Sequence, residues 1–140
     1  MQIEYSLISR GPEAAIFPLL AELQIGVTAY GVLSRGLLSG SRPTSQTDFR
    51  AHLPRFTGQN RERNQQLIEV LQKLAAEKSV TASQLAIAWV LAKGETIVPL
   101  IGARTRLQLA ESLGALEVAL TRDEVARIEA AVPASGRFHP

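Results

Sequence analysis

The apolar positions of this chain follow two different periods, one typical of strands and one typical of helices. In residues 2–7, Ile3, Tyr5 and Leu7 alternate with polar residues, which predicts a short strand. Residues 25–30 are nearly all apolar, which predicts a second strand that is covered on both faces. Residues 96–101 form a third apolar segment and predict a third strand.

A helical pattern separates the first two predicted strands. Pro12 suits the first turn of a helix, and Gly26 lies shortly after its expected end. The apolar face of this helix is expected to contain Ile16, Phe17, Leu19, Leu20 and Leu23. A strand, a helix and a strand in this order predict parallel strands that are joined by a right-handed crossover.

The second half of the chain is predicted to be mainly helical. Residues 39–64 are polar and contain Pro and Gly, which predicts a long loop that is either functional or disordered. The helices that follow are expected around Leu67–Leu74, after Thr81, over Arg106–Leu113 and after Thr121. The second and fourth of these begin with a capping box, Thr81 with Gln84 and Thr121 with Glu124. Trp89 is expected to lie in the core.

The composition excludes several classes of protein. The fifteen Lys and Arg residues are spread without a run, which argues against nucleic acid as a partner. The chain has no Cys, and His52 and His139 are not part of a ligand cluster, so we expect no disulfide and no metal site. No apolar run approaches the ~20 residues of a membrane helix, and no signal-peptide pattern is present. We therefore expect a cytoplasmic protein that has no contact with a membrane.

Several ordered motifs resemble those of the aldo-keto reductase superfamily. They are QIEYSL (2–7), AYGVLSRGLLSG (29–40), QLAIAWVL (84–91), VPLIGAR (98–104) and ESLGA (111–115). The resemblance extends from Gln2 to about Val132. It implies an α/β fold, the C-terminal part of a (β/α)8 TIM barrel, with strands six, seven and eight present. Residues 1–132 would form a partial barrel that carries the NAD(P)H-binding loops, and residues 133–140 a tail.

Three strands do not close a barrel, which needs eight strands and about 250 residues. On this interpretation the barrel is incomplete in this 140-residue chain, and the edges of the first and third strands need to be covered. Self-association through these open edges is one way to cover them.

The resemblance implies that the loop after the second strand binds one end of a nicotinamide cofactor. Gln2 matches the glutamine that contacts the carboxamide, and Tyr30 matches the aromatic residue that stacks on the nicotinamide ring. Backbone N–H groups, together with the charge of Arg35, would hold the pyrophosphate. This pyrophosphate loop consists of Gly31, Val32, Leu33, Ser34, Arg35 and Gly36.

The loop after the third strand is expected to bind the other end of the cofactor. Gly102, Ala103 and Arg104 would line the ribose 2′-phosphate. The positions implied for the adenosine are Gln108, Glu111 and Ser112. The resemblance implies NADPH as the cofactor. Many family members have Arg where this chain has Gln108, and Asn where it has Ser112, so NADH stays the alternative, and Arg104 or Arg106 would have to replace the missing charge.

The catalytic Asp, Tyr, Lys and His of the family precede the part that this chain resembles, so no catalytic residue is assigned. Lys73, Lys78 and Lys93 are on predicted helices, where we expect them to face solvent. The expected function is reduction of an aldehyde or ketone with NAD(P)H, in which this chain holds the cofactor half. It would bind a small carbonyl substrate only together with the missing half. The alternatives are a truncated, non-catalytic half-barrel and a regulatory module for nucleotide binding or assembly.

Overall fold

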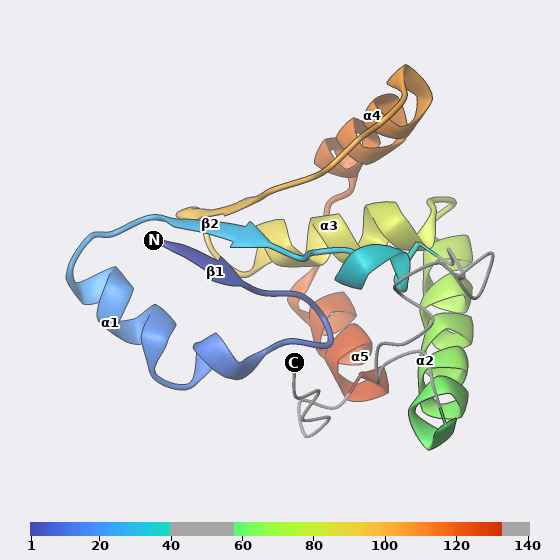
Figure 1. Cartoon of the computed structure of the whole chain (residues 1–140), viewed down its shortest axis with the longest axis horizontal. Coiled ribbons are helices and arrows are strands. Elements are labelled where there is room, and N and C mark those ends of the chain that lie inside the picture. Colours follow the sequence, from blue (N-terminus) through green and yellow to red (C-terminus); the bar gives the residue numbers. More distant parts are fainter. Residues whose placement is uncertain (40–57, 133–140) are drawn as a thin grey trace.

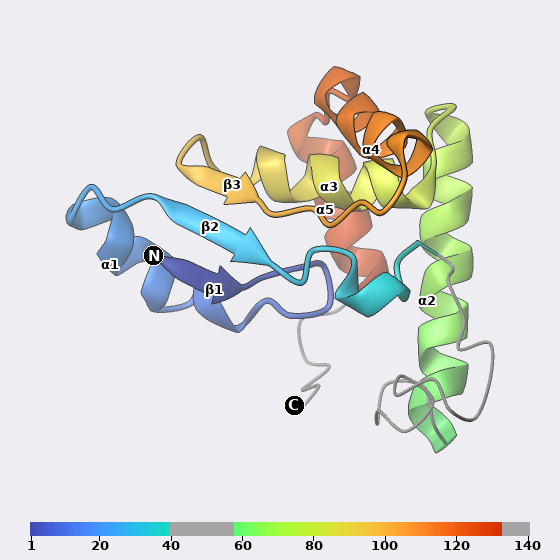
Figure 2. The same ribbon diagram turned by 45° about the horizontal axis from the view of Figure 1, so that its top comes forward.

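The computed structural model describes residues 1–39 and 58–132, and it contains a sheet of three parallel strands (Figures 1 and 2). The strands are β1 (Gln2–Glu4), β2 (Val27–Tyr30) and β3 (Ile97–Pro99), and their order is β1-β2-β3. The predicted strands and their parallel direction are confirmed, although each strand is shorter than its apolar segment. β1 and β3 form the edges of the sheet, as expected.

The two faces of the sheet are in different environments. Val27, Ala29 and Ile97 are buried on one face, and the helix α3 (Ala82–Ala92) packs against β3. On the other face, Thr28 pairs with both Gln2 and Val98, and Glu4 pairs with Tyr30. Tyr30 and Val98 are exposed there, with 44% and 54% of their surface accessible.

The prediction that the second strand is covered on both faces is therefore wrong for this chain. Among the described residues, the apolar sequence of β2 meets helices on one side only. Parallel sheets are almost always covered on both faces, so this open face is an unusual feature of the sheet.

Helices connect and cover the strands. After β1 come η1 (Gly11–Glu13), α1 (Ile16–Glu22) and, beyond β2, η2 (Ser34–Gly36). The later helices are α2 (Gly58–Glu77), α3, α4 (Arg106–Leu113), η5 (Gly114–Glu117) and α5 (Arg122–Ala131). The N-caps of α3 and α5 have both hydrogen bonds of their predicted capping boxes.

The predicted loop over residues 39–64 is wrong at its end, because α2 begins at Gly58. Residues 59–64 are polar, but Gln, Arg and Glu are good helix formers, so a polar sequence here is compatible with a helix as well as with a loop. Residues 40–57 and the predicted tail, 133–140, lie outside the described residues. Arg42, Arg50, Arg55, His52 and His139 are among them.

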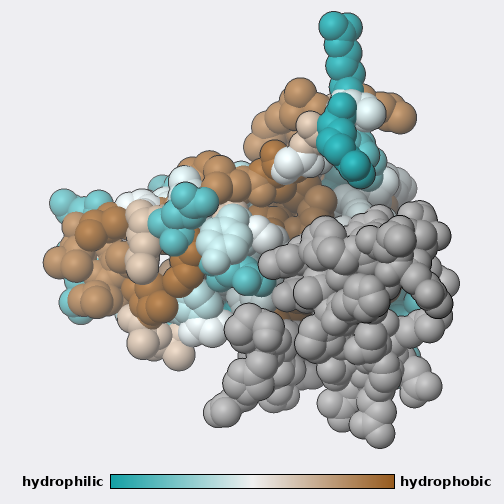
Figure 3. Space-filling view, viewed as in Figure 1, coloured by the Kyte–Doolittle hydropathy of each residue, from teal (hydrophilic) through white to brown (hydrophobic). Residues whose placement is uncertain are grey.

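The side chains that the helices bury only partly match the predicted apolar faces. Trp89 is fully buried, as expected, and its ring lies 5.3 Å from that of Tyr5, which also meets Phe17 of α1. On α1, Leu20 is buried, but Leu19 is exposed, as is Leu23 at the C-cap, so only part of the predicted apolar face packs against the protein. Figure 3 shows apolar side chains on the surface over α1 and also near α4, which extends away from the sheet (Figure 1).

Candidate functional site

A cleft of about 580 Å³ opens at the carboxyl ends of β2 and β3. Its walls are the loop that follows β2, the start of α3, and the loop that leads from β3 into α4. The cleft is lined by Gly31, Val32, Leu33, Gly36, Ser39, Ser83, Leu100, Ile101, Gly102, Arg104, Gln108, Glu111 and Ser112. The structure thus brings most of the predicted cofactor residues together around one space.

The loop after β2 has an unusual backbone. Gly31 and Gly36 have φ angles of 71° and 90°, and Ser34 lies in the left-handed region with φ 49°. The φ angle of Gly31 strains any larger residue, and a Cβ atom here would lie 3.2 Å from Cγ of Glu4, so that side chain would have to shift slightly. The glycine is therefore needed here mainly for its conformation.

The amides of this loop are not all available to a ligand. Ser34 N–H donates to Gly31 O at 2.8 Å, and Gly36 N–H donates to Leu33 O at 3.0 Å. The expectation that the whole segment 31–36 offers its N–H groups is thus wrong for these two amides. The amides of Val32 and Leu33 have no acceptor among the described residues, so they are donors available to an anion.

The loop before α4 is closed by its own side chains. Thr105 is the N-cap of α4 and accepts from Gln108 N–H at 3.2 Å. The side-chain oxygen of Gln108 accepts from the backbone N–H of Arg104 at 2.9 Å. Gln108 therefore shapes the loop that presents Arg104 to the cleft, and the oxygen of its amide is already engaged.

Glu111 joins α4 to the N-terminus of α3. Its Oε1 atom accepts from the hydroxyl of Thr81 at 3.0 Å, and its backbone carbonyl accepts from Nε2 of Gln84 at 2.9 Å. The pair that caps α3 thus also holds a carboxylate in the cleft wall. From sequence, the role of Thr81 and Gln84 was limited to the cap.

Ser83 is a cleft residue that the sequence analysis missed. Its side chain is buried, with 7% of its surface exposed, and it lines the cleft from the first turn of α3. The available signal was a small polar residue next to a helix cap and before an apolar run, which is also typical of an ordinary helix start.

Five predicted cofactor residues are not part of the cleft lining. Gln2 and Tyr30 lie on the open face of the sheet, and Tyr30 comes just before the cleft loop. Ser34 is fully buried, with its hydroxyl paired inside the protein. Ala103 is exposed outside the lining, and the side chain of Arg35 is outside the described part of the chain.

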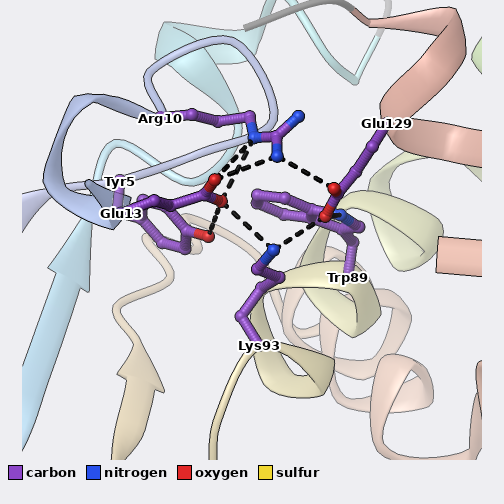
Figure 4. A network of polar contacts seen from close by, with 6 residues as sticks. All are labelled: Tyr5, Arg10, Glu13, Trp89, Lys93 and Glu129. Carbon is purple, nitrogen blue, oxygen red and sulfur yellow. Dashed lines mark hydrogen bonds and ion pairs between the residues drawn. The ribbon is translucent and has the colours of Figure 1, made fainter. Parts of the chain in front are cut away.

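A second polar group lies among η1, α3 and α5, and is separate from the cleft lining (Figure 4). Arg10 donates to Glu13 and to Glu129, in each case at 2.9 Å from Nη2. Lys93 lies 2.8 Å from Glu129 and 3.3 Å from Glu13. Lys93 is thus paired and mostly buried, which contradicts its expected position facing solvent. Lys78 is half-buried and pairs with Glu124 at 2.7 Å.

Tyr5 and Trp89 complete this cluster without forming a catalytic pair. The Tyr5 hydroxyl donates to Glu13 at 2.6 Å, and Nε1 of Trp89 donates to Glu129 at 3.1 Å. Burial raises the pKa of Tyr5, and its hydrogen bond to Glu13 raises it further. A tyrosine that acts as a general acid needs the opposite shift. Tyr5 and Lys93 both contact Glu13, and the raised pKa of Tyr5 does not suit a general acid.

The described residues contain no group of three or more His, Cys, Asp or Glu that could hold a metal ion. Among the helices of the described segments, none combines the length and the apolar character needed to cross a membrane.

Comparison with known proteins places the chain in a family. The model of the Aldo/keto reductase family matches residues 1–133, so the chain belongs to this family. The chain is 38% identical over 148 aligned residues to a protein described as probable aldo-keto reductase 1 from Glycine max. The alignment covers 99% of this chain and 42% of that protein.

A solved structure, that of a glycerol dehydrogenase from Gluconobacter oxydans, resembles this chain with a TM-score of 0.83 and 29% identity. The alignment covers 96% of this chain and 43% of the dehydrogenase. The three parallel strands with their helices thus resemble part of an aldo-keto reductase barrel. The chain spans less than half the length of the relatives it matches.

Proposed function

We propose that this chain holds the nicotinamide-cofactor half of an oxidoreductase of the aldo-keto reductase type, corresponding to barrel strands six to eight. The observation that carries the proposal is that the loops after β2 and β3 line the same cleft. Gly31, Val32 and Leu33 line the cleft on one side, and Arg104 and Glu111 line it on the other. Phosphate sites formed by the last two strand–helix loops are common in (β/α)8 barrels.

Each part of the cleft suits a different part of a dinucleotide. The amides of Val32 and Leu33 would donate to the pyrophosphate, since backbone N–H groups in a turn bind anions well. Arg104 would pair with the ribose 2′-phosphate, and Glu111 with Ser112 would face the adenosine. Tyr30, exposed just before the loop, would stack on the nicotinamide.

The bound cofactor would supply the hydride for reduction of an aldehyde or ketone, because that chemistry belongs to the cofactor. The chain's own residues bind and orient it. The general acid and the substrate loops would come from the other part of the barrel, which would also cover the open face that carries Tyr30 and Val98. NADPH is the proposed cofactor, and NADH the alternative.

Titration of NADPH and of NADH into the purified chain tests the proposal, with nucleotide fluorescence as the signal. Circular dichroism first establishes that the chain is folded. We expect saturable binding, and tighter binding of NADPH than of NADH. If a folded chain binds neither nucleotide, the cofactor half does not act on its own and the proposal fails.

A second candidate is an assembly module without its own chemistry. It is favoured by the exposed apolar side chains of Leu19 and Leu23 on α1 and of Leu107 and Leu113 on α4. Light scattering after gel filtration tests it. A monomer that binds nucleotide would exclude self-assembly as the main role, whereas a stable oligomer that binds none would favour it.

A further inference from the structure

A buried pair of hydroxyl groups joins the turn after β1 to the cleft loop. The Oγ atoms of Ser6 and Ser34 are 3.2 Å apart and share a hydrogen bond, and both side chains have 0% of their surface exposed. A hydroxyl removed from water is costly unless it finds a partner inside the protein. One serine therefore donates to the other, and this bond joins residues that are 28 positions apart in the sequence.

Ser34 has a backbone conformation that favours glycine. Its φ angle is 49°, and its N–H and C=O groups bond to Gly31 and Leu37 at 2.8 and 3.2 Å. A side chain in this conformation is disfavoured unless its surroundings hold it there. The bond to Ser6 is such a restraint, and it acts in the middle of the loop that lines the cleft.

The turn that carries Ser6 is itself well anchored. Ser6 and Ser9 exchange two backbone hydrogen bonds, at 3.3 and 3.0 Å. The Ser9 hydroxyl donates to the carboxylate of Glu4 at 3.2 Å, and the side chain of Glu4 packs closely against Gly31. The turn after β1 thus supports the cleft loop at two points, Gly31 and Ser34.

We propose that Ser6 is a positioning residue for anion binding: through Ser34 it holds the loop so that the amides of Val32 and Leu33 face the cleft. This inference rests on the proposed function, in which those amides receive the pyrophosphate of the cofactor. Ser6 itself does not line the cleft. Its effect on binding is therefore indirect.

The test compares Ser6→Ala with wild type by two measurements. Hydrogen exchange of the Ser34 and Gly36 amides, followed by NMR, reports the order of the loop without any ligand. NADPH titration reports the binding site. We expect exchange to accelerate by about three- to tenfold and the Kd to rise by a similar factor, since one buried hydrogen bond is lost. Ser34→Gly accepts the φ angle but lacks the hydroxyl, so it should show the same faster exchange.

Ile128→Val is the matched control, because it loosens the core at α5, outside the cleft lining. It should leave both the loop exchange and the Kd unchanged. If Ser6→Ala matches wild type in both measurements, or if Ile128→Val moves them equally, the inference is wrong. Should Ser6→Ala not fold, Ser34→Gly carries the same test.

The two proposals fail in different ways. A wild-type chain that binds neither nucleotide would overturn the proposed function and, with it, the link to a cofactor. Faster loop exchange in Ser6→Ala would then still show that Ser6 orders the loop. Normal exchange together with normal NADPH binding in the variant would overturn the role of Ser6 alone.

Discussion

The hydroxyl of Thr81 lies 3.0 Å from Oε1 of Glu111, so the residue that caps α3 also fixes a carboxylate in the wall of the cleft. The same hydroxyl accepts from Gln84 N–H at 3.1 Å. One side chain thus stabilises a helix and orients a site residue that is thirty positions away along the chain.

Replacement of Thr81 is therefore expected to affect stability and binding together. Thr81→Val removes both bonds and should lower the free energy of unfolding by about 1 kcal/mol, the usual value of an N-cap. It should also weaken NADPH binding, because Glu111 loses its donor. Thr81→Ser keeps the hydroxyl and should retain both properties. Urea unfolding and NADPH titration of the two variants provide the check, and equal behaviour of the variants would contradict the double role.

The contrast between the cap and its partner shows what sequence could predict. The capping boxes at Thr81 and Thr121 were predictable because their hydrogen bonds span only three residues and depend on local geometry. The strands were predictable from their apolar periodicity, which is likewise a local property of the sequence. The contact of Thr81 with Glu111 joins separate elements, and no local pattern specifies it.

The errors have a similar cause. Helical spacing predicts an apolar face but does not say whether another element covers it, and Leu19 and Leu23 of the predicted face are exposed. Lys93 was expected in solvent because its two carboxylate partners, Glu13 and Glu129, lie on other elements. Most of the candidate cleft could be predicted from the family motifs, whereas Ser6 and Ser83 depend on the tertiary structure.

Arg104 is predicted to determine the preference between the two nucleotides. It lines the cleft, whereas Arg106, at the start of α4, is exposed and outside the lining. Arg104→Gln should weaken NADPH binding by about tenfold, since hydrogen bonds between charged groups contribute ~1.5–3 kcal/mol, and should leave NADH binding unchanged. Arg106→Gln is the matched control. Equal losses of NADPH affinity in both variants would indicate a general effect of charge.

Gly31 is predicted to be irreplaceable for the shape of the cleft loop. Gly31→Ala places a Cβ atom 3.2 Å from Cγ of Glu4 at a φ angle of 71°. We expect the free energy of unfolding to fall by about 1–3 kcal/mol, the cost of a residue held in a disfavoured conformation. Gly102→Ala has no atom within 4 Å of its added Cβ and should leave stability unchanged. Thermal unfolding of both variants is the measurement. Equal losses of stability in Gly31→Ala and Gly102→Ala would show that this explanation is wrong.

Glu129 is predicted to be the most important acidic residue for stability in the cluster around Trp89. It accepts from Arg10, Lys93 and Trp89 at 2.9, 2.8 and 3.1 Å. Glu129→Gln leaves two partly buried cations with one carboxylate, and should lower the free energy of unfolding by about 1–3 kcal/mol. Glu77→Gln breaks the exposed pair with Arg127 and should change it by less than ~1 kcal/mol. Urea unfolding at pH 7 gives the free energy of unfolding of Glu129→Gln and of Glu77→Gln for comparison with wild type.

Acid is expected to weaken the same cluster through Glu13. Burial raises the pKa of Glu13, but hydrogen bonds from Arg10 and Tyr5 and the charge of Lys93 outweigh it, so the net pKa lies below its usual 4.5. The folded protein therefore binds fewer protons at Glu13 than the unfolded chain does. The resulting stability is fully present above about pH 4.5, the unfolded value, and is lost as the pH falls through the folded pKa.

Glu13→Gln isolates this contribution. Urea midpoints of wild type and variant, measured from pH 7 to pH 3, should differ most at neutral pH and converge as Glu13 becomes protonated. Glu124 has a pKa lowered mainly by its hydrogen bond from Lys78, so it contributes to acid sensitivity in the same direction but outside the cluster. Glu124→Gln therefore serves as the comparison. A difference between wild type and Glu13→Gln that stayed constant down to pH 3 would show that Glu13 acts through packing and not through its charge.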